Sequence, residues 1–232
     1  MIASYLPPSK EHILGTNDVG QDIFSEMVYG TRVSLYIGIF AAFIVTGVGT
    51  VLALVSGYFG GVADKIITAI TNIAMAVPSL PLTVLLIAYL NPGKWSLIIA
   101  ISITAWTGTA RILRARVMQL KELPFIKIEK TMGVHPAVIL FKHILPNIKD
   151  IILTRGAMAI SSAMMTEAGL SFLGLGEFGE KSWGSVLHYA FFRNSIMKKQ
   201  YWWYVPPIVC ICVCVLGFML IGYYGKIKKG GE

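Results

Sequence analysis

The chain has 232 residues, of which 55% are hydrophobic and only 14% are charged. An ordinary soluble domain carries about 25% charged residues, so water cannot be the only solvent of this protein. The formal net charge of +8 does not indicate nucleic-acid binding, because basic residues of membrane proteins gather in cytoplasmic loops and fix the topology. We therefore expect a polytopic membrane protein with no nucleic-acid partner.

Residues 1–32 are polar enough to lie outside the bilayer, and we expect them to form an external segment. Within this segment, Asp18 and Gln21 have the spacing of a helix-capping pair. Apolar residues then gather on one side of the following turns, and Gly30 is placed to end them. The pattern predicts a short helix that lies on the membrane surface and ends at Gly30.

Five apolar runs follow, and a bilayer core needs about 20 apolar residues to be crossed. The runs cover residues 33–59, 66–90, 95–113, 151–175 and 201–225. Pro78 and Pro81 fall inside the second run and are expected to break its helix. The sequence therefore predicts an all-α membrane protein with five transmembrane helices, which make up a transmembrane domain over residues 33–225.

Small residues recur every four positions in the first run, at Gly49, Ala53 and Gly57. This spacing forms a smooth helix face that lets another backbone approach closely. The partner is either a helix of the same chain or a helix of another subunit, and the spacing does not decide between them.

Basic residues predict the orientation. Eight lysine and arginine residues lie between Arg111 and Lys149, so we expect the segment of residues 111–149 to be cytoplasmic. The basic tail of residues 226–232 lies two crossings further along the chain and should be on the same side. The amino terminus is then external and the carboxyl terminus cytoplasmic.

The segment of residues 120–148 predicts two short helices between membrane spans. The first is amphipathic and runs to about Met132, Gly133 breaks it, Pro136 starts the second, and the chain re-enters the membrane near Pro146. Such a pair can dock into a soluble partner and carry its motion into the spans.

The same segment resembles a known motif. Gly133 is followed ten residues later by the letters HILPN at residues 143–147, as in the cytoplasmic loop of permease subunits of binding-protein-dependent ABC importers, in their dipeptide, oligopeptide and nickel branch. Further similar stretches, in family order, are LGTNDVGQDIFSEMVYGTRVSL at 14–35, SGYFGG at 56–61, AWTGTARILRARV at 105–117 and TEAGLSFLGLG at 166–176.

The chain also departs from the family pattern. Asn17, Gln21 and Glu26 stand where the family more often has Asp, Arg and Arg, and Lys127 stands where its loop begins with glutamate. Family members have one more span before the first motif, so this chain would be the six-helix core without its first helix. It is either a shortened form or a chain whose translation begins upstream of Met1.

The resemblance implies a function. A homologous second permease subunit would complete the solute pathway, two ATPase subunits would bind ATP and magnesium, and an external substrate-binding protein would deliver the solute. This chain itself would bind no cofactor and would not be an enzyme, and it contains no Gly-rich phosphate loop. The expected solute is a short peptide, with nickel or a metal chelate as the alternative. A membrane channel or a membrane-embedded enzyme is the alternative of another class.

The resemblance also places the contact with the ATPase on the two short helices of residues 120–148, which we call the coupling helices. The residues expected to take part are Phe125, Lys127, Ile128, Glu129, Met132, Gly133, His135, His143 and Pro146. Glu129 is not expected to substitute for the family glutamate, because two residues along a helix are about 200° apart around its axis.

Four residues of the fourth run are candidates for the translocation pathway, namely Ser161, Ser162, Met164 and Glu167. Glu167 is a carboxylate well inside a predicted span, and such a group should face a bundle interior or a wet cavity. It either lines the pathway or hydrogen-bonds neighbouring groups near the external gate. Arg155, earlier in the run, is expected at the cytoplasmic boundary. The spacing of His, Cys, Asp and Glu predicts no metal site.

Overall fold

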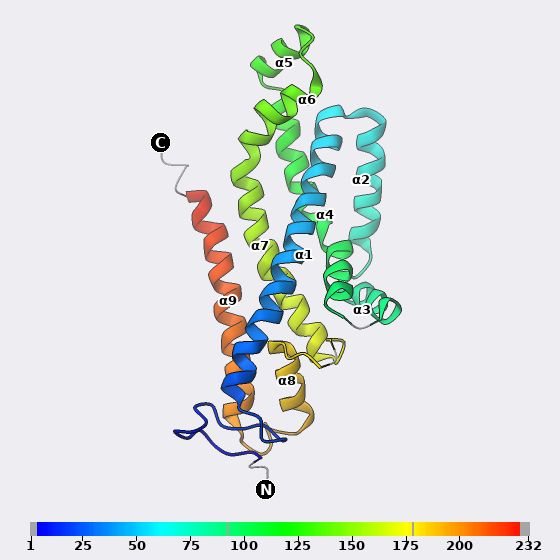
Figure 1. Cartoon of the computed structure of the whole chain (residues 1–232). Coiled ribbons are helices and arrows are strands. Elements are labelled where there is room, and N and C mark those ends of the chain that lie inside the picture. The colour runs from blue at the N-terminus through cyan, green and yellow to red at the C-terminus, as the bar shows by residue number, and fades with distance from the viewer. Residues whose placement is uncertain (1–3, 92, 178, 228–232) are drawn as a thin grey trace. The chain divides into compact units, whose positions relative to one another are not determined.

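The computed structural model describes residues 4–91, 93–177 and 179–227, and its regular elements within these ranges are helices (Figure 1). An isolated β-bridge joins Thr16 to Asp22. The prediction of an all-α chain is confirmed. The elements are α1 (Ile23–Phe59), α2 (Gly61–Ala76), α3 (Ser79–Leu90), α4 (Lys94–Lys121), α5 (Pro124–Thr131), α6 (Pro136–Val138), the π-helix η1 (Ile139–Ile144), α7 (Leu145–Phe172), α8 (Trp183–Phe192) and α9 (Tyr201–Ile227).

Length and composition identify α1, α4 and α9 as helices that can cross a membrane. Helices α2 and α3 qualify only as a pair and meet at an angle of 91°. The described residues thus hold three candidate spans, or four if the bent pair is counted as one. Helix α7 has 28 residues but is not among them, because Arg155, Glu167 and several hydroxyl side chains make its middle turns polar. A fifth crossing by α7 stays a prediction.

Helix α1 starts later than the sequence pattern predicts. Its cap is Asp22, four residues after the expected Asp18. The Asp22 carboxylate accepts hydrogen bonds from the Ser25 N–H and hydroxyl at 2.9 and 2.8 Å. These bonds satisfy a backbone donor at the start of the helix, which begins at Ile23.

Gly30 does not end this helix. The helix continues through it to Phe59, so the predicted separate surface helix is wrong. A Cβ atom at Gly30 would lie 3.1 Å from the Trp183 ring. The glycine therefore allows α8 to approach α1 closely, which is a packing role and not a role as a helix terminator.

The second apolar run is two helices, as its prolines predict. The break lies at Pro78, because proline cannot donate the next helical hydrogen bond. The residue before a proline is also pushed out of the helical region, and Val77 is extended, with φ −82° and ψ 129°. Pro81 lies in the first turn of α3, where its missing N–H has no helical partner to lose, and it does not break that helix.

The predicted pair of short helices is present. Helices α5 and α6 begin at Pro124 and Pro136, and proline is favoured in a first turn. Gly133 separates them with φ +77°, a conformation that glycine adopts without strain. Helix α6 continues through η1 into α7. The wide π turn comes just before Pro146, whose ring would clash with a carbonyl of a regular preceding α turn.

Helix α8 was not predicted, since its residues fall between the fourth and fifth apolar runs. The helix begins with a capping box made of two serines. The Ser185 N–H donates to Ser182 Oγ at 3.2 Å, and the Ser182 N–H donates to Ser185 Oγ at 2.8 Å. Because serine replaces the usual Glu or Gln in the second position, the signal is easy to miss.

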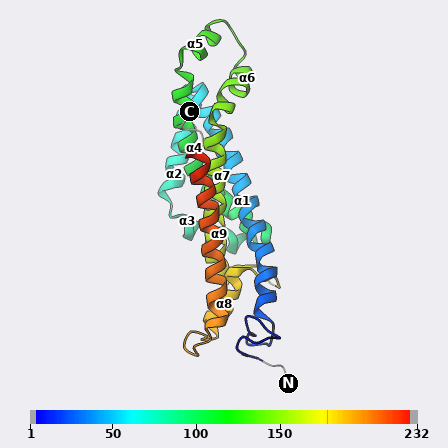
Figure 2. The same ribbon diagram turned by 90° about the vertical axis from the view of Figure 1, so that its left-hand side faces the viewer.

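The chain forms two compact units. The first unit contains Met1–Ala41, Thr83–Ile101 and Ile160–Phe218, and the second contains Ala42–Leu82, Ser102–Ala159 and Met219–Glu232. In the first unit the Trp183 indole at the start of α8 donates to the Met27 carbonyl of α1, and in the second unit α5 and α6 each contact η1 at one end of the helices (Figure 2). The core of the first unit gathers Ile23, Met27, Met164, Trp183, Val186, Ala190 and Trp203. The core of the second gathers Tyr58, Val117, Leu120, Ile126, Ile139, Ile144 and Ile148.

Candidate functional site

Helix α5 has one buried and one exposed apolar side. Ile126 is 2% exposed and packs into the core of the second unit with residues of η1. Phe125, Ile128 and Met132 are 45%, 59% and 76% exposed. Their spacing of three and four residues puts them on neighbouring turns of one helix face. This face is an apolar surface suited to a groove of another protein.

Two polar contacts flank this apolar face. Lys127 Nζ lies 2.8 Å from a Glu122 carboxylate oxygen. Its hydrogen bond holds the pKa of the Glu122 carboxyl below the ordinary value. His143 Nε2 lies 2.9 Å from Glu129 Oε1, and the His143 ring lies 6.1 Å from the Phe125 ring. Lys127 and Glu129 thus point to different partners, in keeping with their positions around the helix.

The remaining predicted coupling residues shape the backbone. His135 caps α6, because its Nδ1 accepts a hydrogen bond from the Ala137 N–H at 3.3 Å. After Pro146, the Asn147 side chain donates to the His143 carbonyl at 2.6 Å. The predicted coupling residues therefore lie in α5, in the turn between α5 and α6, in η1 and at the start of α7.

The face of small residues on α1 packs within the chain. A Cβ atom at Gly49 would lie 2.9 Å from Thr109, and one at Gly57 would lie 2.8 Å from Val117. Ala53 between them is buried. The sequence left open whether this face packs on a helix of the same chain or of another subunit. In the structure its partner is α4 of the same chain, in the second unit.

Glu167 is enclosed in the first unit. Its carboxylate accepts hydrogen bonds from the Ser34 hydroxyl at 3.0 Å and the Ser171 hydroxyl at 2.7 Å. The Trp183 N–H donates to the same Ser34 oxygen at 3.3 Å. In the described chain, no lysine or arginine forms an ion pair with Glu167. These contacts favour the interpretation that Glu167 hydrogen-bonds its neighbours.

The other three pathway candidates divide into two groups. Ser161 is buried and donates to the Val215 carbonyl at 3.0 Å. Met164 is buried against Gly38. Ser162 is exposed. Only Ser162 among the four thus offers its side chain to a solute or a partner.

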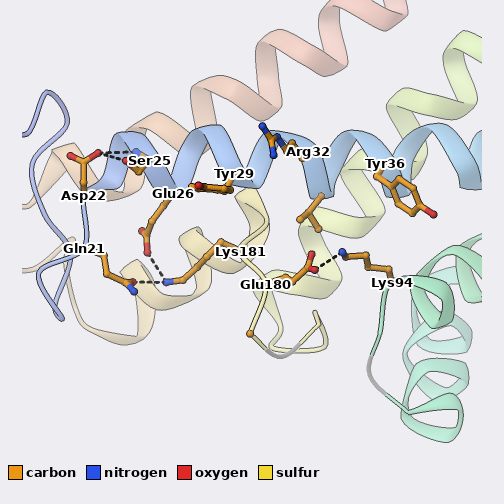
Figure 3. Close-up of a pocket in the computed structure, with 12 residues that line it drawn as sticks. Gln21, Asp22, Ser25, Glu26, Tyr29, Arg32, Tyr36, Lys94, Glu180 and Lys181 are labelled. Atoms are coloured by element: carbon orange, nitrogen blue, oxygen red, sulfur yellow. Dashed lines mark hydrogen bonds and ion pairs between the residues drawn. The ribbon is translucent and has the colours of Figure 1, made fainter.

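A cavity of about 630 Å³ opens in the first unit, between the start of α1 and the segment of residues 179–181 (Figure 3). Lys181 pairs with Glu26 at 2.6 Å, and Lys94 pairs with Glu180. Sequence reasoning did not find this cavity. The signal available was the set of charges in residues 14–35 and 177–181. Its lining is Gln21, Asp22, Ser25, Glu26, Tyr29, Arg32, Val33, Tyr36, Lys94, Gly179, Glu180 and Lys181.

Residues that depart from the family pattern form a network at one end of this cavity. Asn17 donates to Gln21 at 3.0 Å and to Glu26 at 2.9 Å. Lys181 donates to the same two acceptors. Nearby, burial acts to raise the pKa of Asp22, but hydrogen bonds from Ser25 and His12 outweigh it and leave that pKa below its ordinary value.

Within the ranges described, no three His, Cys, Asp or Glu side chains are grouped to hold a metal ion.

Comparison with known proteins decides the family. Residues 49–225 match the family described as the binding-protein-dependent transport system inner membrane component. The chain belongs to this family. It is therefore a multi-pass inner-membrane permease component of a transport complex and not an enzyme, and ATP is hydrolysed by partner ATPase subunits.

Several named permeases are similar to this one. The oligopeptide transport system permease protein OppC of Bacillus subtilis (strain 168) is 38% identical over 93% of this chain and 70% of its own. The dipeptide transport system permease protein DppC of the same strain is 34% identical over 94% and 68%. The glutathione transport system permease protein GsiD of Pectobacterium atrosepticum is 36% identical over 93% and 71%.

The fold is also similar to a solved structure. A chain of the MetNI methionine ABC transporter, in an inward-facing conformation, aligns with a TM-score of 0.69 and 18% sequence identity. The alignment covers 87% of this permease and 95% of that chain. At this identity the likeness concerns the fold alone.

Proposed function

We propose that this permease forms half of the pathway of an importer for short peptides. The observation that carries the proposal is its similarity to permeases named for oligopeptides, dipeptides and glutathione, which is itself a tripeptide. Each similarity extends over more than nine tenths of this chain. A nickel or metal-chelate importer of the same family is the alternative that a test must separate.

The proposed complex contains a homologous second permease, two ATPase subunits and an external substrate-binding protein. Helix α5 is the part of this chain that docks into an ATPase subunit. Its exposed apolar face and its junction with η1 and α7 support this assignment. Because α7 follows η1 without a loop, a displacement of the docked helix is carried into α7, and the pathway alternates between inward-open and outward-open states.

The proposed topology has five spans. Helix α7 is the fourth of these in chain order, and its 28 residues have a rise of about 42 Å, enough to cross a bilayer core of about 30 Å. Residues 1–32 lie outside, the segment of residues 111–149 meets the cytoplasm, and the tail of residues 226–232 is cytoplasmic. Residues 228–232 and the side chains of residues 226 and 227 lie outside the described part of the chain.

The pathway residues are assigned by their exposure. Ser162 is proposed as a contact of the solute or the second permease. Ser161, Met164 and Glu167 are proposed to hold α7 against its neighbours, which is supported by their burial and bonding.

Transport by the reconstituted complex tests the proposal. The two permeases, the ATPase subunits and the binding protein are placed in liposomes, and ATP-dependent uptake of labelled trialanine and of nickel is measured. We expect trialanine uptake that requires both ATP and the binding protein. Uptake of nickel without peptide would overturn the peptide assignment, and uptake without ATP would overturn the importer.

A further inference from the structure

An arginine of α7 has no acidic partner in the described chain. Arg155 lies in the second unit, and its nearest polar contact is the Met158 sulfur, 3.9 Å from Nη1. Its Nε is buried without a hydrogen-bond acceptor. An arginine stays charged at any physiological pH, so it cannot escape this situation by losing a proton.

Three acids of the second unit have partners other than Arg155. Asp64 accepts two hydrogen bonds from Arg114, at 2.5 and 2.7 Å. Glu122 pairs with Lys127, and Glu129 pairs with His143. Within the described residues no carboxylate, Asp150 of the same helix included, forms an ion pair with Arg155, which leaves the guanidinium available to a carboxylate of a solute or of another subunit.

Arg155 lies well along α7. It follows Ile148, a member of the core beside α5, by about 10 Å of helix rise. Its guanidinium faces α4, where a Cβ atom at Gly108 would lie 3.5 Å from Nη2. Arg155 thus packs among the helices, and its expected depth at the cytoplasmic boundary stays a prediction.

Two threonines near Arg155 have hydroxyl groups without a hydrogen-bond partner. Thr46 of α1 lies beside Gly156, at 3.7 Å from a Cβ built there, and Thr109 of α4 packs on Gly49. The hydroxyl oxygens of both threonines are buried without a hydrogen-bond partner. A charged side chain facing lipid at such a place is expensive, and ionisable groups inside membrane bundles usually mark the path of a solute or an ion.

We propose that Arg155 binds the carboxylate of the peptide as it crosses the membrane. A guanidinium matches a carboxylate with two parallel hydrogen bonds, and a peptide has a carboxylate at its end whatever its side chains are. This assignment rests on the proposed peptide import and names the part of the solute that the permease recognises.

Uptake of a peptide and its amide tests the assignment. Trialanine and trialanine amide differ only at the terminal carboxylate, and uptake of both is measured with the wild-type complex, Arg155→Gln, Arg155→Lys and the external control Arg193→Gln. We expect Arg155→Gln to lower the ratio of acid to amide uptake about tenfold, as for the loss of one charged hydrogen-bonded pair. Arg155→Lys should keep part of the preference, and Arg193→Gln all of it.

The outcomes separate the two proposals. A wild-type complex that imports no peptide overturns the proposed function, and the Arg155 assignment falls with it. Peptide uptake with the same acid-to-amide ratio in Arg155→Gln overturns the assignment alone. Equal loss of both substrates, together with loss of the second permease on size-exclusion chromatography, would mean that Arg155 pairs with an acid of that subunit instead.

A charge-rescue experiment needs no amide substrate. Cys210, Cys212 and Cys214 are replaced by serine, and Arg155→Cys is then treated with water-soluble thiosulfonates of either charge. We expect the positive reagent to restore peptide uptake, the negative reagent to leave it low, and peptide to slow both reactions. A cysteine that reacts with neither reagent would overturn the assignment, because the solute path must be wet.

Discussion

Glu167 is a carboxylate bound by hydroxyl groups rather than by a cation. Through Ser34 it meets α1, and Ser34 also receives the Trp183 N–H at the start of α8. Gly184 follows, where a Cβ atom would lie 2.5 Å from the Ala168 carbonyl oxygen. The polar contacts and the close backbone approach together fasten α8 to α1 and α7.

Replacing Glu167 tests this junction. Glu167→Ala leaves the two serine hydroxyls without their acceptor, and an unsatisfied buried polar group costs about 1–3 kcal/mol. Glu167→Gln keeps an oxygen acceptor of similar shape and should lose less than half as much stability. Thermal unfolding in detergent, followed by tryptophan fluorescence, measures both, with the exposed Glu11→Gln as control. Equal losses for Ala and Gln would mean that the negative charge, and not the hydrogen bonding, holds the helices.

At the scale of elements, the contact between α1 and α4 depends on missing side chains. The backbone of α4 approaches so closely that a Cβ atom at Gly57 would lie 3.1 Å from the Arg114 carbonyl oxygen. Backbone cannot move aside as the end of a side chain can. This contact between α1 and α4, which we call the seam, therefore requires glycine at particular positions, and an apolar residue of another kind would not fit there.

A matched pair of glycines on α1 tests the seam. Gly57→Ala should destabilise the second unit by about 1–3 kcal/mol, because an added methyl group overpacks the contact. Gly47→Ala meets no atom within 4 Å and should be neutral, or stabilising by up to about 1 kcal/mol through helix propensity. Denaturation of both variants in the same detergent gives the comparison. Equal effects would show that α4 does not pack on this face in the folded protein.

At the scale of the whole molecule, the charges of the loops determine a testable topology. The segment of residues 111–149 carries eight of the 20 lysine and arginine residues, and helix α5 within it presents charged and apolar groups together. A cytoplasmic position suits both features, since positive loops stay on that side of the membrane.

Cysteine labelling measures this topology. In a background with Cys210, Cys212 and Cys214 replaced by serine, Lys10→Cys and Lys130→Cys each provide one exposed thiol. A membrane-impermeant maleimide added to spheroplasts should label the first variant, whereas the second should react only in inverted vesicles. The reverse pattern would place α5 outside and remove the proposed contact with an ATPase.

Local signals in the sequence predicted local structure well. Pro78 marks the break between α2 and α3, and Gly133 separates α5 from α6, because both residues act on their own backbone. Gly30 misled the prediction, since its function is to accommodate Trp183, which is far away in the sequence. A glycine in a helix looks the same whether it ends the helix or makes room for another.

In the candidate site, too, the sequence predicted features that lie within one stretch of the chain and missed contacts between distant helices. The residues predicted for coupling follow one another in the chain, so the sequence shows that they lie near each other, and their contact with an ATPase stays a prediction. The cavity of the first unit and the unpaired state of Arg155 depend on partners from several helices, which spacing along the chain does not reveal. The enclosure of Glu167 by Ser34 belongs to the same class of long-range contact.

The corner at Pro78 leaves backbone carbonyl groups that need hydrogen-bond partners from their surroundings. The last turn of α2 has carbonyl groups with no following turn to bond them, and in hydrocarbon such groups cannot face lipid chains. Arg111 of α4 lies at this place, with Nη1 3.9 Å from the Met75 sulfur, beside the final residue of α2. A cation there suits the negative pole of a helix. Wherever this corner lies at membrane depth, its free carbonyl groups have to be covered by protein or water instead of acyl chains.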